Sequence, residues 1–102
     1  MQFKHDSNFQ YGTYLQGVVS ISYEELVSLF GKETLAGDGV KVQAEWDLVF
    51  QDGTVATIYD YKEDIPKEQV TNWHIGGYNN RAVELVTDVI SNADDGETTW
   101  PI

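Results

Sequence analysis

Cysteine is absent from this chain of 102 residues, and so are long apolar runs. Without cysteine the chain can form neither disulfide bonds nor thiolate metal sites. No apolar run approaches the roughly 20 residues that span a bilayer, and the first residues lack the charged-then-apolar order of a signal peptide. We therefore expect a soluble cytoplasmic protein with no membrane contact.

Basic residues are scarce: six Lys and Arg stand against 17 Asp and Glu, which gives a formal net charge of −11 at pH 7. A protein that binds a phosphate backbone needs Lys and Arg to displace its counterions, so direct nucleic-acid binding is not expected. The charge could serve solubility alone. Alternatively, it could dock the protein on a basic site of another protein, with rapid and salt-sensitive association.

Apolar residues are sufficient for one modest core, at 41% of the chain with 13% aromatic residues. A chain of this length corresponds to a single domain. We predict an irregular N-terminal arm over residues 1–12, one domain over residues 13–91, and an acidic tail over residues 92–102. The domain is expected to be a monomer or a homodimer, since an exposed edge strand could pair two copies.

Two stretches have the spacing of amphipathic helices. Ser22 and Glu25 form a capping-box pattern at the start of a helix over Tyr23–Phe30. A second helix is predicted over residues 81–91, and either of the two asparagines before it can cap it. Its apolar stripe consists of Ala82, Leu85, Val86 and Val89.

The segment Val40–Lys62 is predicted to form two strands, because apolar and polar residues alternate along it. The Asp-Gly pair at 52–53 favours a two-residue type I′ turn, which would place Glu45 opposite Asp60. A bulged turn would shift the pairing by one residue and place Glu45 opposite Tyr59 instead. Like charges directly opposite one another destabilise a sheet, but the Asp-Gly preference still favours the two-residue turn.

Strands are also predicted over residues 14–21 and 73–75. Gly76-Gly77 is expected to form a tight turn or a point of close backbone approach. The element order is then β-α-β-β-β-α. This order indicates an α+β fold, with an antiparallel sheet of about four strands and two helices on one face.

The segments YEELVSLFG, AEWDLVFQDGTVATIYDYK and WHIGG together resemble a family of small tailed-bacteriophage proteins. The resemblance covers roughly residues 14 to 90 and includes no catalytic motif. It implies a non-structural phage protein, a class that often blocks host defence or redirects host enzymes.

Two groups of residues are candidates for a site. The first is an acidic surface on the hairpin, made of Glu45, Asp47 and Asp60, with Glu63 and Asp64 just beyond it. It could face a partner, remain an ordinary solvated face, or bind Mg²⁺ or Ca²⁺ through its oxygens. Because no loop supplies further ligands at recognisable spacing, we predict no metal site and no cofactor.

The second group surrounds the Gly-Gly pair and consists of Trp73, His74, Gly76, Gly77, Asn80 and Arg81. Backbone amides at the start of a helix attract anions, and the aromatic residues could stack on a base. A nucleotide-like ligand is therefore conceivable, although neither the P-loop nor the dinucleotide pattern is present. A structural turn with an asparagine cap explains the same residues except Arg81.

The residues expected of a catalytic site are few. Two histidines, without cysteine or a serine elbow, make no nucleophilic constellation. We predict a non-enzyme that mimics nucleic acid and inhibits a host or defence protein by occupying its basic surface. The alternatives are a nucleotide sponge at the Gly-Gly and Arg81 site, or a metal-dependent hydrolase that uses the hairpin carboxylates.

Overall fold

A computed structural model of the chain describes residues 1–37 and 41–92. In chain order the elements are β1 (Phe3–His5), β2 (Tyr14–Ser20), α1 (Tyr23–Phe30), β3 (Glu45–Phe50), β4 (Val55–Tyr59), the 3-10 helix η1 (Lys67–Gln69), β5 (Asn72–Gly77) and α2 (Arg81–Ser91). Apart from Asn92, the predicted acidic tail lies outside the described residues. No helix in the described ranges is long and apolar enough to cross a membrane.

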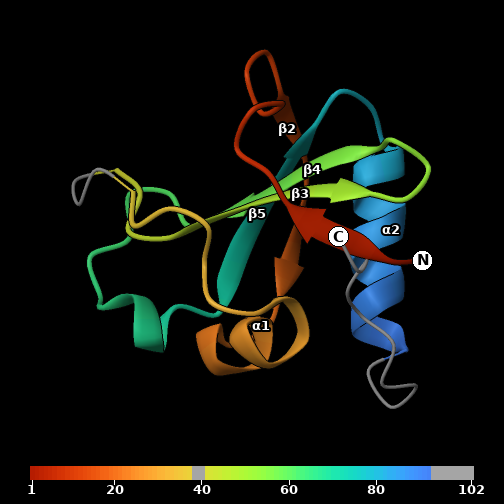
Figure 1. The fold of residues 1–102 in the computed structure, drawn as a ribbon. Helices are drawn as coiled ribbons and strands as arrows, with labels where there is room; N and C mark the ends of the chain where they lie inside the picture. Colours follow the sequence, from red (N-terminus) through yellow and green to blue (C-terminus); the bar gives the residue numbers. More distant parts are fainter. Residues whose placement is uncertain (38–40, 93–102) are drawn as a thin grey trace.

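The strands form one antiparallel sheet in the order β1-β3-β4-β5-β2 (Figure 1). The predicted α+β class is confirmed, with five strands where about four were expected. The additional strand is β1, which was predicted to be irregular. Its Phe3 is fully buried, with its ring 5.3 Å from that of Phe30 and 5.7 Å from that of Phe50, so burial of one aromatic side chain anchors the strand.

The core lies between the sheet and the two helices. Alternation along β3 and β4 turns Trp46, Leu48, Phe50, Ala56 and Ile58 to the helix side, where all are buried. Trp46 packs edge-to-face on Trp73 with ring centroids 5.4 Å apart. Helix α1 contributes Leu26 and Phe30, and α2 contributes the predicted stripe of Ala82, Leu85, Val86 and Val89.

Both helix starts follow from local sequence. The backbone N–H of Glu25 donates to the Ser22 hydroxyl over 3.1 Å, and the Ser22 N–H donates to the Glu25 carboxylate over 3.4 Å. This reciprocal pair is the predicted capping box. At α2 the N-cap residue Asn80 makes no side-chain capping hydrogen bond; of the two predicted asparagines, Asn79 accepts from the backbone N–H of Arg81 over 2.9 Å.

The favoured hairpin register is wrong, and the bulged alternative is the one observed. Glu45 pairs with Tyr59 rather than with Asp60. The Gly53 N–H donates to the Phe50 carbonyl over 2.8 Å, and within the loop of residues 51–53 only Gly53 has a positive φ, at 91°. A type I turn followed by a left-handed glycine makes a three-residue loop with a bulge, which shifts the pairing by one position.

Gly76-Gly77 belongs to β5 and is not a turn. The expected close approach is present, since a Cβ on Gly77 would lie 2.5 Å from the Cβ of Ala82. The absence of a side chain at this position therefore allows α2 to pack directly on the sheet.

Candidate binding site

Two rows of side chains cross the side of the sheet opposite the helices, which we call the helix-free face. Backbone pairing places Asp47, Thr57, Gly76 and Leu15 in one row and Glu45, Tyr59, His74 and Val18 in the next. Acidic residues stand at the β3 end of both rows. Apolar residues stand at the β2 end, where Leu15 is 53% and Val18 63% exposed.

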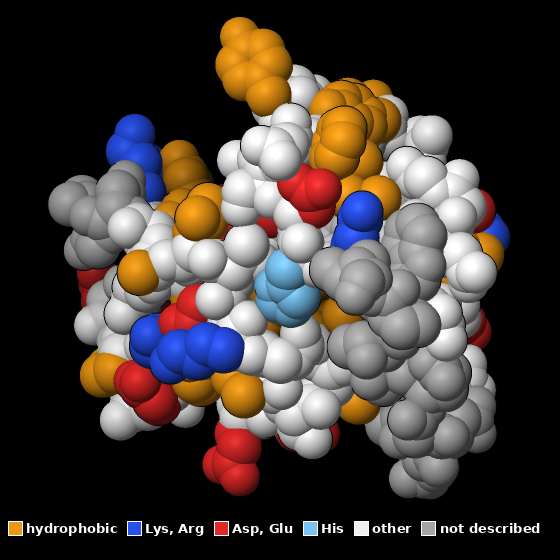
Figure 2. Space-filling model, viewed as in Figure 1, with side chains coloured by type: hydrophobic (Ala, Val, Ile, Leu, Met, Phe, Trp, Pro, Cys, Tyr) orange, Lys and Arg blue, Asp and Glu red, His pale blue; other side chains and the backbone are white. Residues whose placement is uncertain are grey.

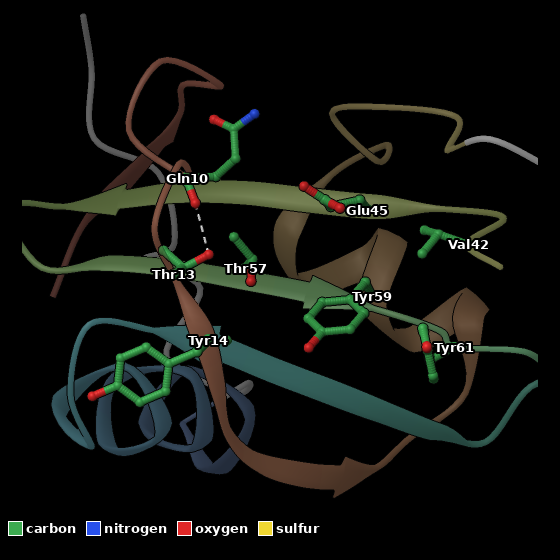
Figure 3. Close-up of a pocket in the computed structure, with 9 residues that line it drawn as sticks. Gln10, Thr13, Tyr14, Val42, Glu45, Thr57, Tyr59 and Tyr61 are labelled. Carbon is green, nitrogen blue, oxygen red and sulfur yellow. Dashed lines mark hydrogen bonds between the residues drawn. The ribbon is translucent and has the colours of Figure 1, made fainter.

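A pocket of about 280 Å³ opens on this face beside Gly76 (Figure 3). It is lined by Gln10, Thr13, Tyr14, Val42, Glu45, Thr57, Tyr59, Tyr61 and Gly76. The close packing of β5 on β4 requires glycine at position 76, because a Cβ there would lie 2.5 Å from the Thr57 hydroxyl oxygen. One wall is a turn of the N-terminal segment, in which the Thr13 N–H and hydroxyl both donate to the Gln10 carbonyl, over 3.1 and 2.7 Å.

A pair of carboxyl groups borders the pocket. Glu45 and Asp47 are two residues apart on β3 and therefore point to the same side of the sheet. Asp47 is fully buried, and neither of its carboxyl oxygens has a hydrogen-bond partner within the described part of the chain. The neighbouring Glu45 carboxyl lines the pocket, and it can donate to Asp47 only when it is protonated.

Burial raises the pKa of Glu45 from 4.5 to about 8, and both hydrogen bonding to Asp47 and repulsion by its charge act in the same direction. Glu45 therefore holds its proton at neutral pH. A positively charged group in the pocket would favour the ionised carboxyl and could replace that proton. The pair therefore gains negative charge only when a cation enters the pocket.

Aromatic rings form the wall beside the carboxyl pair. The Tyr59 and His74 rings meet edge-to-face at 5.4 Å, and the Tyr61 and His74 rings lie 5.9 Å apart. Burial raises the pKa of Tyr59, and Glu45 and Tyr61 add to the rise, so its hydroxyl stays neutral. The faces of aromatic rings attract cations, which suits a pocket that already contains a carboxyl group.

Asp60 has a structural role. It is fully buried, and its carboxylate accepts from the backbone N–H groups of Gln43 over 2.8 Å and Ala44 over 3.1 Å. The Gln43 side-chain amide donates to its second oxygen over 3.1 Å. The one-residue register shift and the end of β4 at Tyr59 turn Asp60 inward, so its predicted place on an exposed acidic surface is wrong.

The other four predicted acids are also not one exposed surface. Asp47 is buried, so the prediction of solvent exposure is wrong for it as well. Glu45 is half-buried in the pocket, while Glu63 and Asp64 follow on the loop after β4. Acidic side chains are dispersed over the side of the molecule drawn in Figure 2, and hydrophobic ones gather at its upper end.

The residues of the alternative ligand site do not converge. Trp73 and Gly77 face the helices, His74 and Gly76 lie on the helix-free face, and Asn80 and Arg81 stand at the start of α2. The Arg81 guanidinium lies 3.3 Å from an Asp52 carboxylate oxygen and 3.0 Å from one of Glu84. Because two acids compensate its charge, it offers little attraction to an anion.

Metal binding has little geometric support. Within residues 1–37 and 41–92, no group of three or more His, Asp or Glu side chains could hold a metal ion. The three hairpin carboxylates of the hydrolase hypothesis are therefore not assembled into such a group.

Several walls of the pocket were not predicted from the sequence. Gln10 and Thr13 lie in a segment expected to be an irregular arm, and Tyr14 was placed in a strand without a function. The available signal was the run of Tyr59 and Tyr61 next to the acidic face of the hairpin. No local pattern indicates that a turn more than 30 residues before Glu45 forms a wall of its pocket.

Comparison with known proteins adds no relative: no protein-family model, no curated protein and no solved structure matches the chain. The resemblance to phage proteins therefore stays a prediction.

Proposed function

We propose that this protein is a non-enzymatic binding protein that occupies a basic surface of another protein. The observation that carries the proposal is the buried Asp47 carboxyl, which has no donor in the described part of the chain apart from a protonated Glu45 beside the pocket. A buried carboxylate without a positively charged partner is unfavourable, even when a neutral group donates a hydrogen bond to it. A positive group from outside would relieve this cost, and the net charge of −11 would draw such a group in.

The type of basic surface follows from the same electrostatics. Surfaces that bind nucleic acid concentrate Lys and Arg. Their dense positive charge would complement the negative charge of this protein. If the chain is a phage protein, such a partner would be a host or defence protein, and occupation of the surface would inhibit it.

The contact region is assigned to the helix-free face and the loop that follows β4. Glu45 opens onto this face, and Tyr61 joins it to the exposed Asp64 and the partly exposed Glu63. Three carboxyl groups of the predicted set thus remain available to a partner, while Asp47 and Asp60 act from the interior.

Capture of proteins from nuclease-treated bacterial lysate tests the proposal. The immobilised protein should retain basic proteins at about 50 mM NaCl and release them at about 500 mM, because salt screens exposed charges. Added duplex DNA should also release them if the occupied surface binds nucleic acid. The double variant Glu63→Gln/Asp64→Asn should retain several-fold less.

A matched control removes two charges from the helix side of the molecule. The residues are the exposed Glu24 of α1 and Asp88 of α2, changed as Glu24→Gln/Asp88→Asn. This variant should retain as much as the unchanged protein. Equal loss in both double variants would mean that only net charge matters, and capture indifferent to salt would contradict the proposal.

A further inference from the structure

We propose that the pocket on the helix-free face binds a single alkylammonium group, the end of a lysine side chain that a partner protein inserts. That the ligand belongs to a partner rests on the proposed function. The affinity for an alkylammonium group rests on the pocket alone, so the two can fail separately.

The first support is a match between acceptors and donors. Both carboxyl oxygens of Asp47 and the side-chain oxygen of Gln10 are buried without a hydrogen-bond partner in the described residues. Gln10 and Glu45 both line the pocket, and in Figure 3 they lie on the same side of β3. An ammonium group carries three donors and no acceptor. It could therefore donate to the Glu45 carboxylate and to the Gln10 side-chain oxygen, whereas Asp47 does not line the pocket and acts through its charge.

The second support is the wall of the pocket. Tyr59 and Tyr61 lie side by side at the pocket in Figure 3, with Val42 near Tyr61. Aromatic faces attract an ammonium group, and the aliphatic stem of a lysine packs well on apolar surface while its charged end reaches a polar group. The pocket thus offers separate surfaces for the two parts of one side chain.

Size and shape favour lysine over larger or planar cations. At about 280 Å³ the pocket is at the small end of the roughly 300–1,000 Å³ typical of ligand sites, and it has room for one side chain. A guanidinium binds best as a planar fork facing both oxygens of one carboxylate. Only Glu45 of the pair lines the cavity, and its carboxyl is also hydrogen-bonded to the buried Asp47. A compact ammonium needs one free oxygen and fits this arrangement better than a fork that needs two.

Binding would change the charge of the carboxyl pair. When the ammonium group enters, the Glu45 carboxyl releases its proton to solvent. The pair then carries one more negative charge, and the positive ligand balances it. No covalent bond forms or breaks apart from the O–H bond of that carboxyl group. Binding should therefore release up to one proton near neutral pH.

NMR titration with n-butylammonium chloride at constant ionic strength tests the inference directly. We expect saturable shifts of the Tyr59, Tyr61 and Gly76 backbone amides, and roughly fivefold weaker binding of n-butylguanidinium. Neutral n-butanol and Mg²⁺ should not produce these shifts. Glu45→Gln should weaken binding about tenfold or more, and Tyr61→Ala, at a partly exposed wall, about two- to fivefold.

Glu24→Gln is the matched control, because Glu24 lines a different pocket together with Tyr23. This variant should bind n-butylammonium as the unchanged protein does, and the amide spectrum of each variant should confirm that it is folded. Equal effects of Glu24→Gln and Glu45→Gln would overturn the inference, as would tighter binding of guanidinium, Mg²⁺ or butanol, or no saturable shift.

The same variants separate this inference from the proposed function. Salt-sensitive capture of basic proteins that survives Glu45→Gln would overturn the lysine pocket and leave the function standing. Saturable n-butylammonium binding by a protein that captures nothing basic would do the reverse.

Discussion

Acidic residues in this chain have sharply different roles at the scale of single side chains. Asp60 and Asp64 are four positions apart in a run rich in acids. Asp60 is buried and accepts three hydrogen bonds, whereas Asp64 is exposed on the loop. Their charges contribute equally to the sequence total, but only one of the two is available to a partner.

Removal of the Asp60 carboxylate should destabilise the protein. Asp60→Ala leaves the buried Ala44 N–H without its acceptor, and we expect a loss of about 2–3 kcal/mol in the free energy of unfolding. Asp60→Asn keeps one acceptor and should lose about half as much. Urea denaturation at pH 7 measures both. Asp64→Ala is the control and should change the stability by less than about 0.5 kcal/mol; similar losses at the two positions would contradict the structural role of Asp60.

At the scale of elements, a partly buried ion pair connects η1 to the segment after α1. The Glu33 side chain is 4% exposed, its carboxylate lies 2.7 Å from the Lys67 ammonium, and it accepts from the Tyr23 hydroxyl over 2.6 Å. Burial alone would raise the pKa of Glu33, but the hydrogen bonds from Lys67 and Tyr23 outweigh it and hold the pKa below 4.5. The pair therefore favours the folded state when Glu33 is ionised.

Glu33→Gln should lower the free energy of unfolding by about 2 kcal/mol at pH 7. Because the folded pKa lies below the unfolded value of 4.5, this contribution is complete above that value and is lost as the pH falls through the folded pKa. The difference between the two proteins should therefore shrink in acid. Urea denaturation at pH 7 and pH 3 measures it.

Lys32 provides the control for this pair. Its ammonium also lies near Glu33, at 3.8 Å, but its side chain is 74% exposed. Lys32→Met should change the stability by less than about 0.5 kcal/mol, whereas Lys67→Met should approach the effect of Glu33→Gln. Equal effects of the two lysine variants would show that burial does not set the strength of the pair.

Elements that a local sequence pattern specifies were predictable from the sequence. The capping box at Ser22 and the apolar stripe of α2 define both helices, and the alternation around Trp46 defines β3. The register at Gly53 was not predictable, because an Asp-Gly pair fits both a two-residue turn and a bulged one. The structure shows the bulged turn, in which Gly53 has a positive φ and Asp52 does not.

The pocket depends on contacts that no local pattern encodes. It joins the N-terminal turn at Gln10 to β3, β4 and β5, and it exists because Gly76 lacks a side chain where those elements meet. The sequence correctly drew attention to Glu45 and Asp47, but it could not show that one is buried and the other opens to a cavity. Burial follows from tertiary packing.

At the scale of the whole molecule, a net charge of −11 attracts cations to every part of the surface. Such a field shifts all carboxyl groups in the same direction and weakens as salt is added. A specific site must therefore differ from this background. The groups near Glu45 that can titrate or carry charge are Asp47 of β3, Tyr59 of β4, His74 of β5 and Tyr61 after β4.

The titration of Glu45, followed by its side-chain carboxyl ¹³C shift at constant ionic strength, tests the central claim most directly. In the free protein the pKa should lie near 8, because burial and Asp47 disfavour the charged form. With saturating n-butylammonium it should fall by one unit or more, while Glu24 and the other exposed carboxyl groups stay unchanged. A pKa near 4.5 in the free protein, or a shift no larger than that of Glu24, would contradict the account.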